Sequence, residues 1–438
     1  PEERAEQIAA KRKSSALISK VNHQRLRDTR NVANFNWLRE GEHCNKLFFK
    51  SIQQRDQNLH IPQVNVKGVR STNHEQKSEL IRQSFQETFT RRAPDHQALI
   101  TLIKSLKASS RGLTPSDIAH LNLRLDLKEL NNRSETHPED PGYIPNWLDQ
   151  LLNNLEMGTA PGPDGIPNEF YYILRNHDKF RALLEAMIMA VIMQGAKPTL
   201  SMRRTYYRLL YKRGKYTKSQ LESGSLDDTD RDPANLTNWR PIGLECCDFK
   251  LITGHLASAL KPVMDSLIGA EQTAFIESRT IHDNIILIQM LIHHHNLENT
   301  PAGLLFVDFA HAYDYISQDY ILEILAALDF PLTFINLLKN LMTNQLGQVI
   351  VNGDLTGSFQ VNNGGKQGDP LFPYLFIIAL EALFAHLEAD TDYEGIQTPD
   401  PDIKFRAAGY ADDTVLGIGS ESDIPRVELA LDLFERAS

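Results

Sequence analysis

The chain has 438 residues, too many for one compact domain and enough for two or three packed modules. Its hydrophobic content of 41% is that of an ordinary globular protein, and three cysteines (Cys44, Cys246 and Cys247) offer neither a disulfide framework nor zinc-ligand spacing. No apolar run reaches about 18 residues, so we predict no transmembrane helix and no membrane partner.

The formal net charge of −10 argues against a uniformly basic nucleic-acid-binding protein. The basic residues are nevertheless concentrated: the stretch 11–30 is mostly basic, and 203–218 contains no acidic residue. Such local surfaces can bind phosphates on an otherwise acidic protein, although solvated helix faces would give the same pattern. The candidate nucleic-acid contacts are Arg12, Lys13, Lys20, Arg39 and Lys46.

The first part of the chain is predicted to be largely helical. Loosely spaced apolar residues favour helix over 1–60, and 61–75 is typical of a short hairpin or loop. Helices are expected over 76–130, with a break where Thr114 can cap a helix that opens at Pro115.

The middle of the chain alternates helices with polar segments. Residues 131–146 are polar and proline-rich, which predicts a linker or surface loop, and 216–238 predicts a flexible insertion. Helices are expected over 147–157 and near 167–176 and 179–195.

From residue 300 the pattern changes to short strands alternating with helices. Residues 304–307 predict a buried strand, and 348–354 with 357–361 predict a hairpin. The expected helices cover 319–328, 330–341, 375–387 and 427–437.

Three acids are the strongest chemical signal. Tyr410-Ala411-Asp412-Asp413 lies between two apolar segments, which predicts a β-hairpin with the carboxylates at its tip, and Asp308 ends an upstream strand. Such carboxylates can hold two divalent cations roughly 3.5–4 Å apart, which suits in-line phosphoryl transfer. A surface turn with two aspartates is common, so the interpretation depends on the other motifs. Asp314, near the next helix start, is expected to cap that helix.

Two further segments favour phosphate binding. Residues 364–371 combine three glycines with Gln367 and a helix start, where a backbone can approach an anion closely, although a tight strand-to-helix turn has the same composition. Arg240 precedes a proline and suits forked phosphate contacts, with Lys212 and Lys215 as further cations. Surface lysines would give the same pattern.

Together these segments resemble a reverse transcriptase of the non-LTR (LINE-type) retrotransposon branch. The resemblance is collinear over about 37–418. It is carried by the block 37–49, Ala160-Pro161-Gly162-Pro163-Asp164-Gly165, Arg240-Pro241-Ile242, the stretch 270–284, the Asp308 segment, Gln367-Gly368 and Tyr410-Ala411-Asp412-Asp413.

The resemblance implies an α+β right-hand polymerase with fingers and an antiparallel palm sheet. We expect a helical N-terminal extension over 1–110, fingers with insertions over 111–300, and a palm over 301–438. Two Mg²⁺ ions, replaceable by Mn²⁺, would be held by Asp308, Asp412, Asp413 and the carbonyl of Phe309. Nucleotide contacts would come from Lys212, Lys215, Arg240, Gln367, Gly368 and Tyr313, the last as a steric gate that selects dNTP.

The sequence departs from the family pattern in places. His311 stands where the family often has Lys, and Phe372 where Ser is usual. The chain begins without Met and ends at Ser438, so we expect an internal piece of a longer protein without the thumb, and weak synthesis by this piece alone. His293-His294-His295 point in different directions on a helix and are not expected to bind metal.

The implied partners are an RNA template, a DNA primer and dNTP, and the implied compartment is intracellular, with nuclear action by resemblance. One alternative is a catalytically idle relic that retains RNA binding. Another is a polymerase resembling a group II intron maturase or telomerase, which the block 37–49 disfavours. A metal-dependent nuclease or phosphatase would not account for Tyr313 and Gln367-Gly368.

Overall fold

The computed structural model describes residues 61–135, 144–211, 232, 234–309 and 311–438. Residues 61–438 form one compact unit. The predicted helix over 1–60 and the block 37–49 therefore lie outside the described residues.

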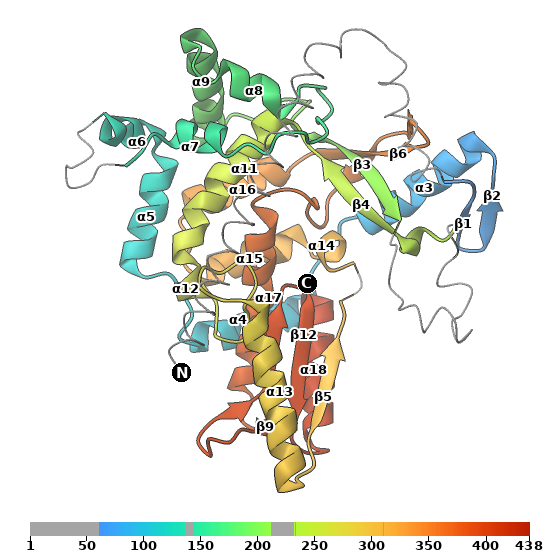
Figure 1. Ribbon diagram of the computed structural model, residues 1–438, viewed down its shortest axis with the longest axis vertical. Helices are drawn as coiled ribbons and strands as arrows, with labels where there is room; N and C mark the ends of the chain where they lie inside the picture. Colours follow the sequence, from blue (N-terminus) through green and yellow to red (C-terminus); the bar gives the residue numbers. More distant parts are fainter. Residues whose placement is uncertain (1–60, 136–143, 212–231, 233, 310) are drawn as a thin grey trace, which may run out of the picture. The chain divides into compact units, whose positions relative to one another are not determined.

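Helices dominate the first part of this unit, as the sequence predicts (Figure 1). The expected capping of α5 is confirmed: the Thr114 side chain accepts from Asp117 N–H, and the Asp117 carboxylate accepts from Thr114 N–H. A hairpin of β1 (Val64–Val66) and β2 (Val69–Ser71) precedes these helices. The helices are α3 (His74–Thr88), α4 (His96–Ala108), α5 (Pro115–Leu125), α6 (Leu127–Ser134), α7 (Trp147–Asn153), α8 (Asn168–Leu174) and α9 (Asp178–Gln194).

A five-stranded sheet joins strands from distant parts of the sequence. The order is β4-β3-β6-β7, with β8 also paired to β6. One face is apolar and packs with α3 around Phe85, Tyr207 and Phe359, because alternate residues along each strand point to the same side. The strands are β3 (Arg204–Tyr211), β4 (Trp239–Leu244), β6 (Gln345–Val351), β7 (Asp354–Leu355) and β8 (Phe359–Val361). The predicted hairpin over 348–361 is thus confirmed.

A three-stranded antiparallel sheet has the order β11-β12-β5. It consists of β11 (Ala407–Tyr410), β12 (Asp413–Ile418) and β5 (Gly303–Val307), with the small pair β9 (Ile396–Gln397) and β10 (Lys404–Phe405) nearby. The prediction that 304–307 is buried is wrong. Within the described residues β5 pairs only with β12, and as an edge strand it leaves Phe306 69% exposed.

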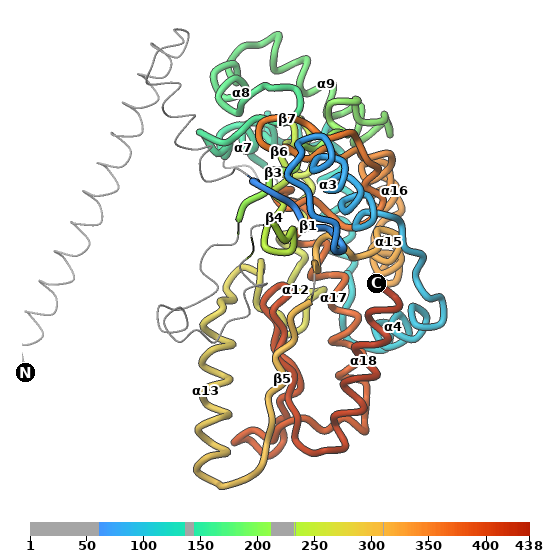
Figure 2. Tube along the Cα trace, turned by 90° about the vertical axis from the view of Figure 1, so that its right-hand side faces the viewer, coloured from blue at the N-terminus to red at the C-terminus, as the bar shows by residue number. Residues whose placement is uncertain are grey.

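Helices from the second half complete the fold. Figure 2 shows α13 and α18 on opposite sides of the three-stranded sheet. The helices are α11 (Cys247–Leu260), α12 (Met264–Leu267), α13 (Ile281–Glu298), α14 (Ala312–Tyr315), α15 (Gln318–Ala327), α16 (Leu332–Met342), α17 (Phe372–Ala389) and α18 (Asp423–Ala437), with short 3-10 turns η2 (Leu236–Asn238) and η3 (Lys261–Val263).

Helix α17 is the centre of the larger core and contacts α4, α15 and α18. Its residues are apolar on every side, which is typical of a helix buried all round. In the part of the chain that the structure describes, it is the one helix long and apolar enough to cross a membrane, and 72% of it is buried within the protein. The architecture is a mixture of helix and sheet, as the α+β prediction requires.

Candidate active site

The acidic segment forms a β-hairpin with a two-residue turn, as predicted. Tyr410 pairs with Asp413, so Ala411 and Asp412 form the turn between β11 and β12. Ala411 has φ of +56°, the left-handed conformation that two-residue hairpin turns require and that alanine rarely adopts. The turn is therefore held by its surroundings and not by the preference of its own residue.

Asp308 lies at the same end of the sheet as the turn. Val307, the last residue of β5, pairs with Thr414 of β12. The residue after Val307 is Asp308 and the residue before Thr414 is Asp413, so these two aspartates are neighbours across the strands. Burial raises the pKa of Asp412, and the charges of Asp413 and Asp308 raise it further, while Arg240 opposes them. The structure thus brings the three predicted acids together.

Tyr313 belongs to α14 and lies beside the acids. Its ring stacks on Phe376, with centroids 4.7 Å apart and 16° between the planes. Burial raises the pKa of its hydroxyl, and the charge of Asp412 adds to the effect. Phe372, one of the departures from the family pattern, is buried with its ring centroid 5.5 Å from that of Tyr313. This ring also fills the space that a side chain at Gly365 would need, because a Cβ there would lie 1.9 Å from it.

The glycine loop is tied to both the tyrosine and the larger sheet. Gly365 N–H donates to the Tyr313 carbonyl at 2.8 Å, and Gly243 N–H on β4 donates to the Gln367 carbonyl at 2.9 Å. Gln367 is half-buried and Gly368 is exposed. The loop that carries both residues is therefore fixed between α14 and β4.

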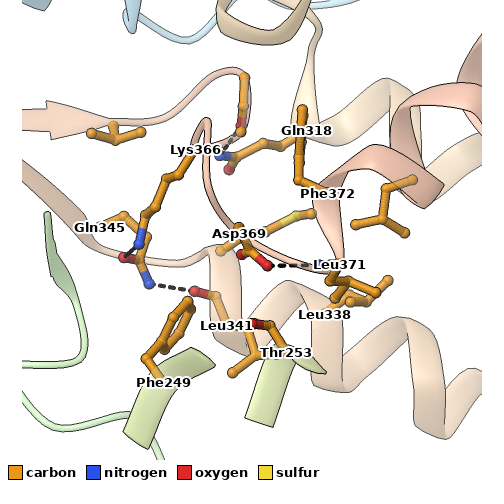
Figure 3. Close-up of a pocket in the computed structure, with 15 residues that line it drawn as sticks. Phe249, Thr253, Gln318, Leu338, Leu341, Gln345, Lys366, Asp369, Leu371 and Phe372 are labelled. Carbon is orange, nitrogen blue, oxygen red and sulfur yellow. Dashed lines mark hydrogen bonds between the residues drawn. The ribbon is translucent and has the colours of Figure 1, made fainter. Parts of the chain in front are cut away.

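Lys366 of this loop forms a buried ion pair with Glu245, and Figure 3 shows the hydrogen bond that Lys366 also makes to Gln345. Lys366 Nζ lies 2.8 Å from Glu245 Oε1 and donates to Gln345 Oε1 at 2.8 Å. Burial raises the pKa of Asp369 to about 7, and the charge of Glu245 adds to the rise. Lys366, Asp369 and Gln345 line a small cavity of about 50 Å³.

Arg240 is exposed on β4 and shares one face of the sheet with Arg208, because Arg208 pairs with Ile242, two residues along. This face is opposite the one that packs on α3. Lys212 and Lys215 lie outside the described residues, as do the candidate nucleic-acid contacts Arg12, Lys13, Lys20, Arg39 and Lys46.

Comparison with known proteins places the acids in a recognised domain. Residues 228–437 match the family model described as reverse transcriptase (RNA-dependent DNA polymerase). The uncharacterized 149 kDa protein of transposon TX1 from Xenopus laevis is 28% identical over 294 residues, which is 66% of this chain and 21% of that protein. Residues 228–437 are thus similar to reverse transcriptases, and the relatives that align with this chain are proteins of transposable elements.

Further relatives of the domain are Pol polyproteins. One, from the type-1 retrotransposable element R2 of Popillia japonica, is 28% identical over 142 residues, covering 32% of this chain and 23% of the relative. Another, from the type-2 element R2DM of Drosophila melanogaster, is 26% identical over 181 residues, covering 41% of this chain and 16% of the relative. The aligned part thus spans about a fifth of the length of these relatives.

Within the described residues there is a second group of possible metal ligands. One ligand atom each from Asp164, Cys246 and Asp248 lies within 4.8 Å of the others. Burial raises the pKa of the Cys246 thiol to about 12, which keeps it protonated at neutral pH, and the thiol donates to the Ser201 carbonyl at 3.4 Å. Gly162 packs against the backbone of Cys246, since a Cβ at Gly162 would lie 2.3 Å from Cys246 N, so this group lies where the 158–167 loop meets the residues after β4.

Asp314 and His295, which the sequence singled out, both have defined partners in the structure. Asp314 was predicted to cap a helix, but it lies inside α14, 3% exposed, with a carboxylate oxygen 3.6 Å from His311 Nδ1. His295 bonds through one ring nitrogen to Thr300 Oγ1 and through the other to the Gln397 carbonyl.

The sequence did not indicate the roles of Lys366, Glu245 and Gln272. Gln272 is fully buried and bonds to the backbone of the acidic turn. The one sequence signal for Gln272 was its place in the stretch 270–284, which carries part of the family resemblance.

Proposed function

We propose that this domain is an RNA-directed DNA polymerase that transfers nucleotides from dNTP to a primer 3′-hydroxyl with two divalent metal ions. The observation that carries the proposal is the strand register at the acidic end of the small sheet. It brings Asp308 beside Asp413, with Asp412 in the adjoining turn. The match of residues 228–437 to reverse transcriptases supports the same chemistry.

The donor set fits magnesium. Mg²⁺ prefers oxygen ligands and keeps substrate phosphates in its shell, and the three side chains offer only carboxylate oxygens. The crowded charges that raise the pKa of Asp412 are the charges that a bound cation would neutralise. Asp308, Asp412 and Asp413, together with the Phe309 carbonyl, would hold the two ions, and Mn²⁺ would substitute for Mg²⁺.

When bound, the two ions would stabilise the attacking and the leaving oxygen of an in-line displacement. The protein's own contribution would be positioning. Arg240, with Lys212 or Lys215, would meet the triphosphate, and Gln367 and Gly368 would lie near the nucleotide and template. Tyr313 would lie beneath the sugar and reject a 2′-hydroxyl. The fixed geometry of such groups is what converts binding into rate.

The proposal includes a fingers and palm arrangement. In it the fingers over 111–300 and the palm over 301–438 share the five-stranded sheet, because β3 pairs with β6. The extension over 1–110 would hold RNA through its basic residues, and the domain would act on an RNA template and a DNA primer at chromosomal DNA in the nucleus.

The test is primer extension on an RNA template annealed to a DNA primer, with all four dNTPs and either Mg²⁺ or Mn²⁺. The 438-residue chain should extend the primer, and the doubly substituted Asp412→Ala, Asp413→Ala chain should not. Asp402→Ala is a matched control, because Asp402 is an exposed acid in the turn between β9 and β10. A folded chain that binds RNA in a salt-dependent manner without extending the primer would identify the idle relic instead.

A further inference from the structure

A single buried amide holds the acidic turn. Gln272 is 0% exposed and lies next to Ala411, one residue before Asp412. Ala411 N–H donates to Gln272 Oε1 at 3.0 Å, and Gln272 Nε2 donates to the Ala411 carbonyl at 3.2 Å. Both backbone groups of the residue with φ of +56° are therefore satisfied by one side chain.

The chemistry of glutamine suits this role. A carboxamide offers one acceptor and two donors on a planar group, so it pairs with a backbone N–H and C=O together. Glutamate would lose the donor and add a charge beside the acids, and an apolar side chain would leave both backbone groups unpaired in a buried place. Gln272 Oε1 also accepts from Ala274 N–H at 3.0 Å, which fixes the orientation of the amide.

The segment that carries Gln272 is bonded to β11 as a further strand would be. Gly409 N–H donates to the Glu271 carbonyl at 2.7 Å, and Thr273 N–H donates to the Gly409 carbonyl at 3.0 Å. A side chain at Gly409 would prevent this approach, because its Cβ would lie 2.9 Å from Phe384 and 3.0 Å from Gln272 Nε2.

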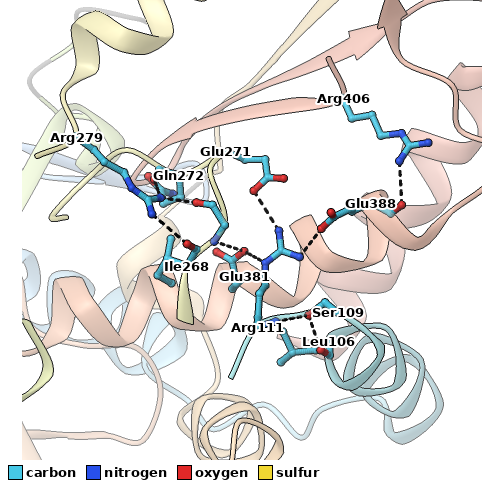
Figure 4. Close-up of polar contacts among 11 residues, drawn as sticks. Leu106, Ser109, Arg111, Ile268, Glu271, Gln272, Arg279, Glu381, Glu388 and Arg406 are labelled. Carbon is cyan, nitrogen blue, oxygen red and sulfur yellow. Dashed lines mark hydrogen bonds and ion pairs between the residues drawn. The ribbon is translucent and has the colours of Figure 1, made fainter. Parts of the chain in front are cut away.

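Two arginines anchor the same segment (Figure 4). Arg279 donates to the Gln272 carbonyl at 2.9 Å and lies 3.3 Å from Asp265. The side chain of Arg111, 6% exposed, pairs with Glu271 at 3.1 Å and with the buried Glu381 of the core helix α17. The segment that carries the amide is thus connected to the centre of the core by charged and backbone contacts, in addition to its bonds to β11.

We infer that Gln272 is a positioning residue that sets the acidic turn in the geometry needed for metal binding. The inference rests on the proposed function, because it concerns the carboxylates assigned there as ligands. Residues that orient metal ligands without touching the metal typically change metal affinity or activity about 10–100-fold when substituted. A role in folding alone would lower stability without this change.

The experiment compares Gln272→Met, which keeps the length and removes both bonds, with the wild-type chain. Mn²⁺ affinity is measured from the paramagnetic resonance signal of free Mn²⁺, beside the thermal midpoint and the kcat and KM of primer extension. We expect Gln272→Met to weaken Mn²⁺ binding about 10–100-fold and to lower kcat more than it raises the KM for dNTP. Gln272→Glu, which keeps the acceptor, provides a second variant if Gln272→Met does not fold, and the same loss is expected from it.

Tyr393→Phe is the matched control for destabilisation of the same hairpin. The Tyr393 hydroxyl is placed 2.7 Å from the Gly417 carbonyl, on β12 and away from the acidic turn. Its loss should lower the thermal midpoint and leave Mn²⁺ affinity unchanged. Equal Mn²⁺ loss in Tyr393→Phe, or wild-type affinity in a folded Gln272 variant, would overturn the inference.

Asp412→Asn separates this inference from the proposed function. If Asp412→Asn loses Mn²⁺ binding and the Gln272 variants keep it, the inference alone is wrong. If Asp412→Asn binds Mn²⁺ like the wild type, the carboxylate site is wrong, and the inference about Gln272 is overturned with it.

Discussion

The ring of Tyr313 stacks on the ring of Phe376, with 4.7 Å between centroids and 16° between planes. Phe372 lies against the same ring at 5.5 Å. Two buried aromatic side chains therefore fix the tyrosine in one place. Burial raises the pKa of its hydroxyl, and the nearby charge of Asp412 raises it further. A fixed ring can exclude an atom, whereas a mobile one would yield.

Replacing this ring should change the choice of sugar. Tyr313→Ala is expected to raise ribonucleotide incorporation relative to deoxynucleotide incorporation by about tenfold or more, because one small group in a pocket is worth roughly 10–200-fold. Single-nucleotide extension with each substrate measures the ratio. Tyr313→Phe should keep the wild-type ratio, and so should Tyr315→Phe, whose ring is covered by Arg92. An unchanged ratio in Tyr313→Ala would show that Tyr313 does not select the sugar.

Arg240 should contribute mainly to nucleotide binding. It is exposed on the open face of the sheet, and its charge acts on Asp412. Arg240→Ala is expected to raise the KM for dNTP by about tenfold, since hydrogen bonds to charged groups contribute about 1.5–3 kcal/mol. Arg240→Lys should recover part of this, and Arg133→Ala on α6, which removes one positive charge elsewhere, should have no effect. Steady-state extension kinetics distinguish these cases.

The buried pair of Lys366 and Glu245 should be costly to break from one side. Lys366→Met would leave Glu245, 2% exposed, without its counter-charge, and should lower the free energy of unfolding by about 3–5 kcal/mol. Adding Glu245→Gln should restore about 1–3 kcal/mol of that loss. Urea denaturation of the wild type, the two single variants and the double variant measures the loss and its recovery. Strict additivity of the two substitutions would show that the pair is not coupled.

Asp248 gives the fold a pH dependence. Burial raises the pKa of its carboxyl from 3.8 to about 6, and the charge of Asp164 adds to this against a hydrogen bond from Phe249 N–H. Because the folded protein holds this proton more tightly than the unfolded chain, stability is lost as the pH rises from about 4 through about 6. Asp248→Asn should therefore be more stable than the wild type by about 2 kcal/mol at pH 7.5, and this gain should vanish near pH 4. Urea denaturation at both pH values checks it, and a gain that is the same at both would contradict it.

Much of the architecture could be predicted from local patterns. The acidic hairpin, the Thr114 cap and the apolar helix that became α17 all depend on residues close together in sequence. The prediction for 304–307 failed because an apolar strand looks the same whether it lies at the centre or the edge of a sheet, and pairing partners distant in sequence decide which.

The residues of the site likewise divide into those that local patterns predict and those that they do not. Asp308, Asp412 and Asp413 stand out because they lie at the ends of recognisable strands, and Tyr313 stands out through the family resemblance. The supporting contacts do not, since Gln272 reaches Ala411 across 139 positions and Lys366 reaches Glu245 from another segment. No periodicity in the sequence reports such a pairing.

The most direct test of the account is the location of bound Mn²⁺ by anomalous scattering from crystals of the chain. The account predicts Mn²⁺ at oxygens of Asp308, Asp412 and Asp413, and its loss from that position in Asp412→Asn. Mn²⁺ held instead by Asp164, Cys246 and Asp248, with none at the acidic turn, would contradict the central claim.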